Sequence, residues 1–156
     1  MAHGSPLLFG NWLESFFNVS PFQGQIEEVA VWGSDCLPAQ LKAKAKRHQL
    51  CLAHQLRNLQ AVVDRYPALW WTKAMQTLFR AAIHLHHQRA ELPPQQFQNR
   101  VARLEQLCEW LLKRPLSQPE VVKLQRRYRK HRQSLFVFLY RTDVPPTNNV
   151  SERALR

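Results

Sequence analysis

Glycine and cysteine are scarce in this chain of 156 residues, and each shortage excludes classes of function. Only four glycines occur and none follows Gly33, which excludes the glycine-rich loops that bind nucleotide phosphates and dinucleotides. Three cysteines, an odd number, are typical of a reducing compartment rather than of a disulfide framework. The chain also lacks a secretory signal and an apolar run long enough to span a bilayer. We therefore expect a cytoplasmic protein without a membrane partner.

Acidic residues are half as numerous as basic ones, with 11 Asp and Glu against 22 Lys and Arg, and the formal net charge is +11. Residues 1–40 carry four acids and no Lys or Arg, hence −4, whereas residues 41–156 carry 22 basic and 7 acidic residues, hence +15. Such a concentrated excess favours a polyanion partner, nucleic acid above all, over a protein that is merely soluble and basic. Hydrophobic residues make up 45% of the chain, which is enough for a buried core.

Apolar patterning predicts a short strand followed mainly by helices. Residues 28–32 form an apolar, β-rich run bounded by Gly33 and Ser34. Residues 37–47 predict a short helix rich in Ala and Lys, and residues 48–51 fit either a second strand or the entry to the next helix. Further on, apolar residues repeat at helical spacing and predict four helices: 52–66, 69–90, Pro94 to Pro115, and Ser117 to about Tyr140. Ser117 and Glu120 have the spacing of a capping box that opens the last of them.

This last helix is predicted to have a basic face. Six of the ten residues from Lys123 to Arg132 are Lys or Arg, and no acid occurs between Glu120 and Asp143. Helical periodicity groups five apolar residues on one side: Val121, Leu124, Tyr128, Leu135 and Leu139. It groups four cations on the other, with Arg129 at the margin: Lys123, Arg126, Arg127 and Lys130. A solvated face normally mixes charge signs, so this one favours contact with DNA phosphates, which would position DNA without reading its sequence.

Two carboxylates, Asp35 and Glu152, are the candidate metal ligands and catalytic groups. Asp35 follows the predicted strand, and catalytic groups collect at the carboxyl ends of strands in open α/β sheets, although an Asx-turn is the simpler explanation. Glu152 lies three residues after Asn149 in the first turn of a predicted helix, where a capping box is the simpler explanation. Two distant carboxylates that meet over divalent metal would supply the parts of metal-assisted phosphodiester chemistry.

A zinc site is the other metal hypothesis. Cys36, His48, Cys51 and His54 are ligand types that zinc uses, but their spacing matches no recognised zinc finger and lacks a paired Cys-x-x-Cys. A small zinc-stabilised interaction module therefore stays an alternative, as does a non-catalytic basic helical DNA-binding protein.

The motifs together resemble the transposases of insertion-sequence-sixty-six type. The similarity is carried by Gly33-Ser-Asp35-Cys, by His48-Gln-Leu-Cys-Leu-Ala-His54-Gln-Leu-Arg57, and by Val144-Pro-Pro-Thr-Asn-Asn-Val-Ser-Glu152-Arg-Ala-Leu-Arg156. These are DDE-class enzymes with a ribonuclease-H-like core, so the resemblance implies Mg²⁺ (or Mn²⁺) as cofactor, and transposon ends and target DNA as partners. It also implies that Asp35 is the second catalytic acid and Glu152 the third. The intact enzyme would bind transposon DNA and catalyse its metal-dependent cleavage and strand transfer.

The resemblance covers residues 27–156 and implies a division of the chain. We expect a mostly α fold with a partial ribonuclease-H-like α/β core of about two strands: a poorly matched leader over 1–26, a core segment over 27–66, a helical insertion over 67–142, and the start of the Glu helix over 143–156. The family's first catalytic Asp lies on an earlier strand, and residues 1–26 contain no Asp. We therefore expect a truncated fragment that does not cut DNA by itself, located at the bacterial nucleoid, with a homo-oligomer left open.

Overall fold

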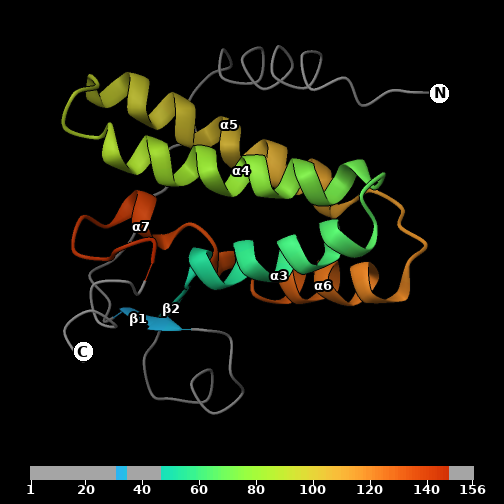
Figure 1. Ribbon diagram of the computed structural model, residues 1–156. Coiled ribbons are helices and arrows are strands. Elements are labelled where there is room, and N and C mark those ends of the chain that lie inside the picture. The colour runs from blue at the N-terminus through green and yellow to red at the C-terminus, as the bar shows by residue number, and fades with distance from the viewer. Residues whose placement is uncertain (1–30, 35–46, 148–156) are drawn as a thin grey trace.

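The computed structural model describes residues 31–34 and 47–147, which are mostly helical (Figure 1). Two short strands come first, β1 (Val31–Ser34) and β2 (Arg47–Leu50). Four longer helices follow: α3 (Leu52–Arg65), α4 (Trp70–His87), α5 (Pro94–Leu112) and α6 (Pro119–Lys130). The described part ends with a short 3₁₀ turn, η1 (Arg132–Ser134), and a single helical turn, α7 (Val137–Tyr140).

The four longer helices form an antiparallel bundle, in which α4 packs between α3 and α5, and α6 packs on α5. Each helix contributes apolar residues to a core that is contiguous from β2 through α7. In α3 the stripe is buried at Leu52 and Leu59 and only partly buried further along the helix. Pro94 and Pro119 occupy the first turns of α5 and α6, where a missing N–H costs no helical hydrogen bond. The helices predicted over 52–66, 69–90 and Pro94 to Pro115 are therefore confirmed, with ends shifted by no more than three residues.

Side chains from two neighbouring helices donate hydrogen bonds to the last carbonyls of α5. The last carbonyls of a helix have no partner within it and need donors from elsewhere. Trp71 Nε1 of α4 donates to the Leu111 carbonyl at 2.8 Å, and Gln125 Nε2 of α6 donates to the same oxygen at 3.3 Å. Arg129 Nε, also of α6, donates to the Leu112 carbonyl at 2.6 Å. These bonds fix α6 against α5 and so set the direction in which the outer face of α6 points.

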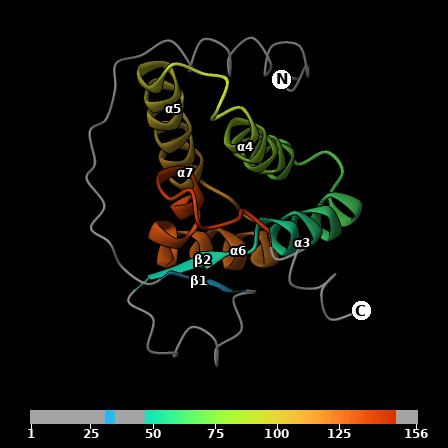
Figure 2. The same cartoon turned by 90° about the vertical axis from the view of Figure 1, so that its left-hand side faces the viewer.

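The two strands pair in parallel, with Val31 opposite Arg47 and Ser34 opposite Leu50. They lie beneath α6 and α7 when the bundle is viewed from its end (Figure 2). Of the two alternatives for residues 48–51, the strand is correct, and the adjoining helix begins at Leu52. The predicted helix over 37–47 lies outside the described residues, apart from Arg47, which belongs to β2.

The prediction of one helix from Ser117 to Tyr140 was wrong. The α-helix ends at Lys130, the 3₁₀ turn η1 follows, and α-helical structure resumes only for Val137–Tyr140. The physical reason is the run Leu135–Leu139, in which five consecutive residues are buried. A surface helix buries one stripe, so a continuous helix would have turned some of these side chains to solvent. The capping box was wrong as well, because Gln118 is the N-cap residue and makes no side-chain capping bond.

The predicted mostly α fold is thus confirmed. The first strand was predicted over 28–32 and bounded by Gly33 and Ser34, whereas β1 covers Val31–Ser34 and includes both of these residues. None of the described helices combines the length and the apolar composition that a membrane span requires.

Candidate nucleic-acid interface and flanks of the catalytic acids

The described backbone brings together the flanks of Asp35 and Glu152, although both acids lie outside the described residues. Ser34, which precedes Asp35 in the sequence, pairs with Leu50 at the carboxyl end of the two parallel strands. Two residues further on, the Leu52 N–H donates to the Pro146 carbonyl at 3.0 Å. The segment that leads to Glu152 therefore passes the same end of the strand pair at which β1 stops.

Gln49 of β2 attaches residues 135–147, which we call the return segment, to the sheet. Its side chain is 1% exposed, and its Nε2 donates to the Leu50 and Leu135 carbonyls at 2.6 and 3.0 Å. Its Oε1 accepts from the Phe138 N–H at 3.2 Å. One amide thus satisfies two backbone groups that the break between α6 and α7 removes from helical pairing. Sequence analysis missed this role because an isolated Gln in a short strand carries no recognisable pattern.

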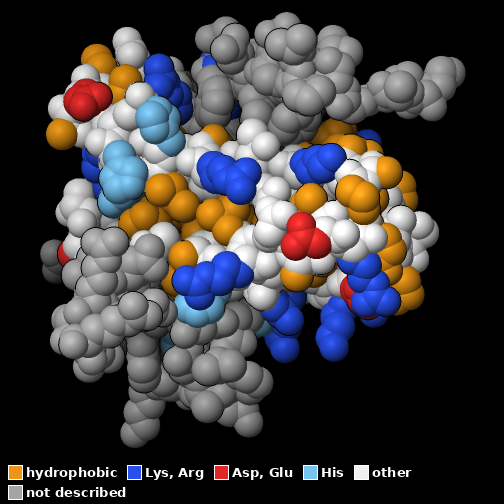
Figure 3. Space-filling model, in the orientation of Figure 1, with side chains coloured by type: hydrophobic (Ala, Val, Ile, Leu, Met, Phe, Trp, Pro, Cys, Tyr) orange, Lys and Arg blue, Asp and Glu red, His pale blue; other side chains and the backbone are white. Residues whose placement is uncertain are grey.

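The outer face of α6 carries the four cations predicted from helical periodicity. Val121, Leu124 and Tyr128 are buried, as expected of the opposite side. Three of the four cations are exposed and the fourth, Arg127, is partly exposed: Lys123, Arg126, Arg127 and Lys130. Lys and Arg side chains also project from the edge of the molecule where α3 and α6 lie (Figure 3). We call these four residues the α6 basic face.

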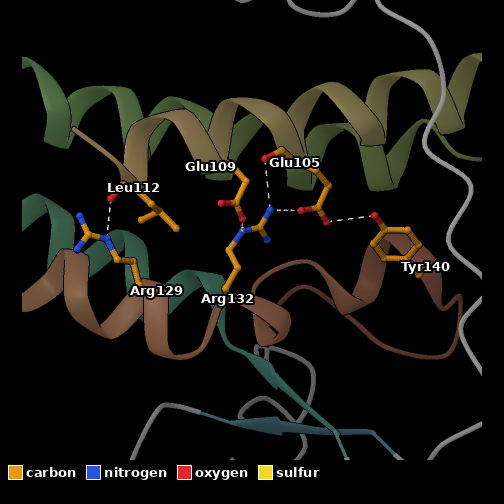
Figure 4. Close-up of polar contacts among 6 residues, drawn as sticks. All are labelled: Glu105, Glu109, Leu112, Arg129, Arg132 and Tyr140. Carbon is orange, nitrogen blue, oxygen red and sulfur yellow. Dashed lines mark hydrogen bonds and ion pairs between the residues drawn. The ribbon is translucent and has the colours of Figure 1, made fainter.

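The other two basic residues of the predicted cluster have structural partners. Arg129 turns back to α5, where it donates to Leu112 and, at 3.0 Å, to Gln125 Oε1. Arg132 lies beyond the end of α6 and contacts two carboxylates of α5, Glu105 and Glu109, the latter at 2.7 Å (Figure 4). Of the six basic residues between Lys123 and Arg132, the four of the α6 basic face are therefore the ones left for an external anion, and these are the four that helical periodicity had grouped together.

Burial makes the Arg132 network more than a surface ion pair. The Arg132 and Glu105 side chains are 19% and 23% exposed, and Glu105 also accepts a hydrogen bond from the Tyr140 hydroxyl at 3.1 Å. Burial, and then the Glu105 charge, raise the pKa of Tyr140, so the phenol stays protonated and donates. The network borders an open cavity of about 740 Å³ between α5 and residues 132–140. Through Arg132 and Tyr140, the network holds the chain that follows α6 against α5.

Of the four proposed zinc ligands, one lies outside the described residues and the other three do not come together in a metal site. Cys36 is outside the described residues, whereas Cys51 is buried with 1% exposure. Within residues 47–147, no three His, Cys, Asp or Glu side chains come together in a way that could hold a metal ion. His48, Cys51 and His54 therefore do not form a metal centre by themselves.

Comparison with known proteins decides the family. The sequence model described as the Transposase IS66 family matches residues 27–156. The chain belongs to this family. The match covers all three motifs on which the resemblance was based, including Asp35 and Glu152. No curated protein and no solved structure matches the chain. Membership of the IS66 family gives the protein a transposase-related function, and the α6 basic face and the strand end become the places to look for it.

Proposed function

We propose that this IS66-family chain binds transposon DNA through the α6 basic face, and that Asp35 and Glu152 are the second and third acids of a DDE catalytic site. This site would cleave DNA and transfer strands. The two parallel strands would belong to a ribonuclease-H-like core, and residues 67–142, which include α4 to α7, to a helical insertion in it. A DNA substrate would place the protein at the nucleoid in the bacterial cytoplasm.

The observation that carries this proposal is the approach of the returning segment to the strand ends. Adjacent strands are about 4.8 Å apart and two residues span at most about 7 Å, so Ser34 and Pro146 lie within about 15 Å of each other. Asp35 is the next residue after Ser34, and six residues lead from Pro146 to Glu152, a reach of at most about 20 Å. More than a hundred residues separate the acids in sequence, yet the chain permits their carboxylates to meet.

The donor set fits a hard divalent cation. Mg²⁺ binds through one or two carboxylates together with substrate phosphate oxygens, and Mn²⁺ accepts the same oxygen ligands. A divalent ion held there would supply Lewis-acid polarisation of the scissile phosphate and would stabilise charge on the attacking and leaving oxygens. Asp35 and Glu152 would hold the ion, and the α6 basic face would hold the DNA. A DDE site has three acids, and a third carboxylate would complete the positioning of metal and phosphate.

The salt dependence of DNA affinity tests the α6 basic face. Each phosphate contact neutralised by a cation contributes about 0.9 to the slope of log affinity against log salt concentration. Arg126→Gln combined with Arg127→Gln should therefore flatten the slope by about one to two units. Arg80→Gln, which removes an exposed cation of α4, serves as the matched control and should leave the slope near the wild-type value. Equal slopes for all three proteins would remove α6 from the interface.

Binding calorimetry with Mn²⁺ tests the two acids. Asp35→Asn and Glu152→Gln should each weaken binding strongly, because the ion loses one of its charged oxygen ligands. Asp64→Asn removes an exposed carboxylate of α3 and should change little. Unchanged affinity in both acid variants would leave a basic DNA-binding protein without a catalytic site.

A further inference from the structure

Trp70 is exposed to an unusual degree for its size. Its relative exposure is 41%, and it is the exposed large hydrophobic side chain of the described residues. Its ring lies 5.9 Å from that of Trp110, centroid to centroid, at an angle of 50°. Trp70 does not belong to the buried core, whereas the neighbouring Trp71 lies in it with 0% exposure. An exposed indole beside a second one is a candidate contact surface.

Cations surround the two indoles. The Arg114 guanidinium lies 4.3 Å from the centroid of the Trp110 ring. Lys73 and Lys113 each follow a tryptophan by three residues, on α4 and at the carboxyl end of α5, which places each on the same helix face as that tryptophan. Both lysines are exposed. We call Trp70, Trp110, Lys73, Lys113 and Arg114 the tryptophan platform.

Among the described residues, two acids at this end of the bundle are paired with cations outside the platform. Glu109, adjacent to Trp110, binds Arg132 at 2.7 Å, and Glu120, at the start of α6, binds Arg65 at 2.5 Å. Within residues 47–147, Arg114 forms no ion pair. The platform therefore combines flat aromatic surface with uncompensated positive charge.

Exposed aromatic surface with positive charge favours single-stranded DNA over a second copy of the chain as the partner of this platform. A second copy of the chain would bring its own net charge of +11 to a surface that is already positive. A single strand of DNA brings phosphates for the cations and a base for the exposed indole, and base–aromatic stacking tolerates any base sequence. The platform also lies at the end of the bundle where α3 ends and α6 begins, which the Arg65–Glu120 ion pair joins (Figure 1). DNA bound along α6 would extend from Lys123 toward it.

We propose that the tryptophan platform binds an unpaired nucleotide of the DNA, with its base stacked on Trp70 and its phosphates beside Lys73, Lys113 and Arg114. This inference rests on the proposed function, since it assumes that DNA is the ligand. It adds that the ligand includes an unpaired segment next to the duplex.

Fluorescence anisotropy with three DNA probes tests it: a blunt duplex, the same duplex with a short single-stranded extension, and the same extension made of abasic sugar-phosphates. The wild-type chain should bind the base-carrying extension about five- to a hundredfold more tightly than the abasic one, the range that one stacked base gives. Trp70→Ala should abolish this preference and leave the affinity for the other two probes unchanged. Trp70→Phe keeps an aromatic face and should retain most of the preference. Thermal melts followed by circular dichroism check that both variants are folded.

The three probes distinguish a platform that does not bind a base from a protein that does not bind DNA. If the blunt duplex binds and responds to Arg126→Gln, but base-carrying and abasic extensions bind equally, the platform assignment is wrong while DNA binding stands. Equal weakening of all three probes by Trp70→Ala would also overturn it, as would a change from dimer to monomer in sedimentation. If no probe binds in a salt-dependent way, the proposed function fails, and this inference fails with it.

Discussion

Replacement of Gln49 by Leu is expected to cost more stability than any surface substitution in the chain. The amide satisfies the Leu135 carbonyl and the Phe138 N–H, both within buried residues, and leucine of similar size can satisfy neither. A buried backbone group left without a partner costs about 1–3 kcal/mol, so the two together should cost about 2–6 kcal/mol. For a protein of this size the melting temperature should fall by about 6–18 °C.

Chemical denaturation followed by circular dichroism measures this cost, with Gln96→Leu as the matched control. Gln96 is exposed on α5, and its replacement should change the free energy of unfolding by less than about 0.5 kcal/mol. Gln49→Leu should also weaken Mn²⁺ binding, because the return segment toward Glu152 loses its attachment to β2, while the salt slope set by α6 stays unchanged. A Gln49→Leu protein as stable as the wild type would refute the assignment of Gln49 as the residue that holds this segment.

Three further outcomes follow from buried polar groups. Arg132→Met should lower the free energy of unfolding by about 2–4 kcal/mol in urea denaturation, because Glu105 stays partly buried without its cation, whereas the half-exposed Glu109 adds little. Burial, and next the charge of His87, lower the pKa of His86 below 6.5, so the folded state favours the neutral ring. Stability should therefore fall as the pH drops below about 6.5, and His86→Gln should reduce this fall in melts between about pH 7 and pH 5. Burial raises the pKa of the Cys108 thiol to about 12, so iodoacetamide should label it only after unfolding, and mass spectrometry of the native protein should find it unmodified.

The helical part of the fold was predictable because its cause is local. Apolar residues at helical spacing predicted α3, α4 and α5, and prolines at the helix starts and beyond their ends marked the boundaries. The same reasoning placed four cations on the outer side of α6, where they are found. The DNA contact that we propose for them is a further step, which the salt-dependence experiment addresses.

The break after Lys130 could not be predicted from local pattern. Val121, Leu124, Tyr128, Leu135 and Leu139 fit one continuous helix, and each of the five is buried. What ends the helix is the burial of the intervening Phe136, Val137 and Phe138, together with the two bonds from Gln49, which lies 86 and 89 residues away in sequence. No window of sequence contains both partners of such a contact.

The sequence by itself determined where the long helices lie, how the charge is distributed, and, through its three motifs, the family to which the chain belongs. Only the tertiary structure showed that Arg129 and Arg132 bind within the protein, because their partners, the backbone and carboxylates of α5, come beside them only in the fold. It also decided that residues 143–147 return to the carboxyl ends of the strands, through a hydrogen bond between Leu52 and Pro146. Periodicity and motifs are properties of neighbouring residues, whereas the partner of a buried polar group is set by packing between segments far apart in the chain.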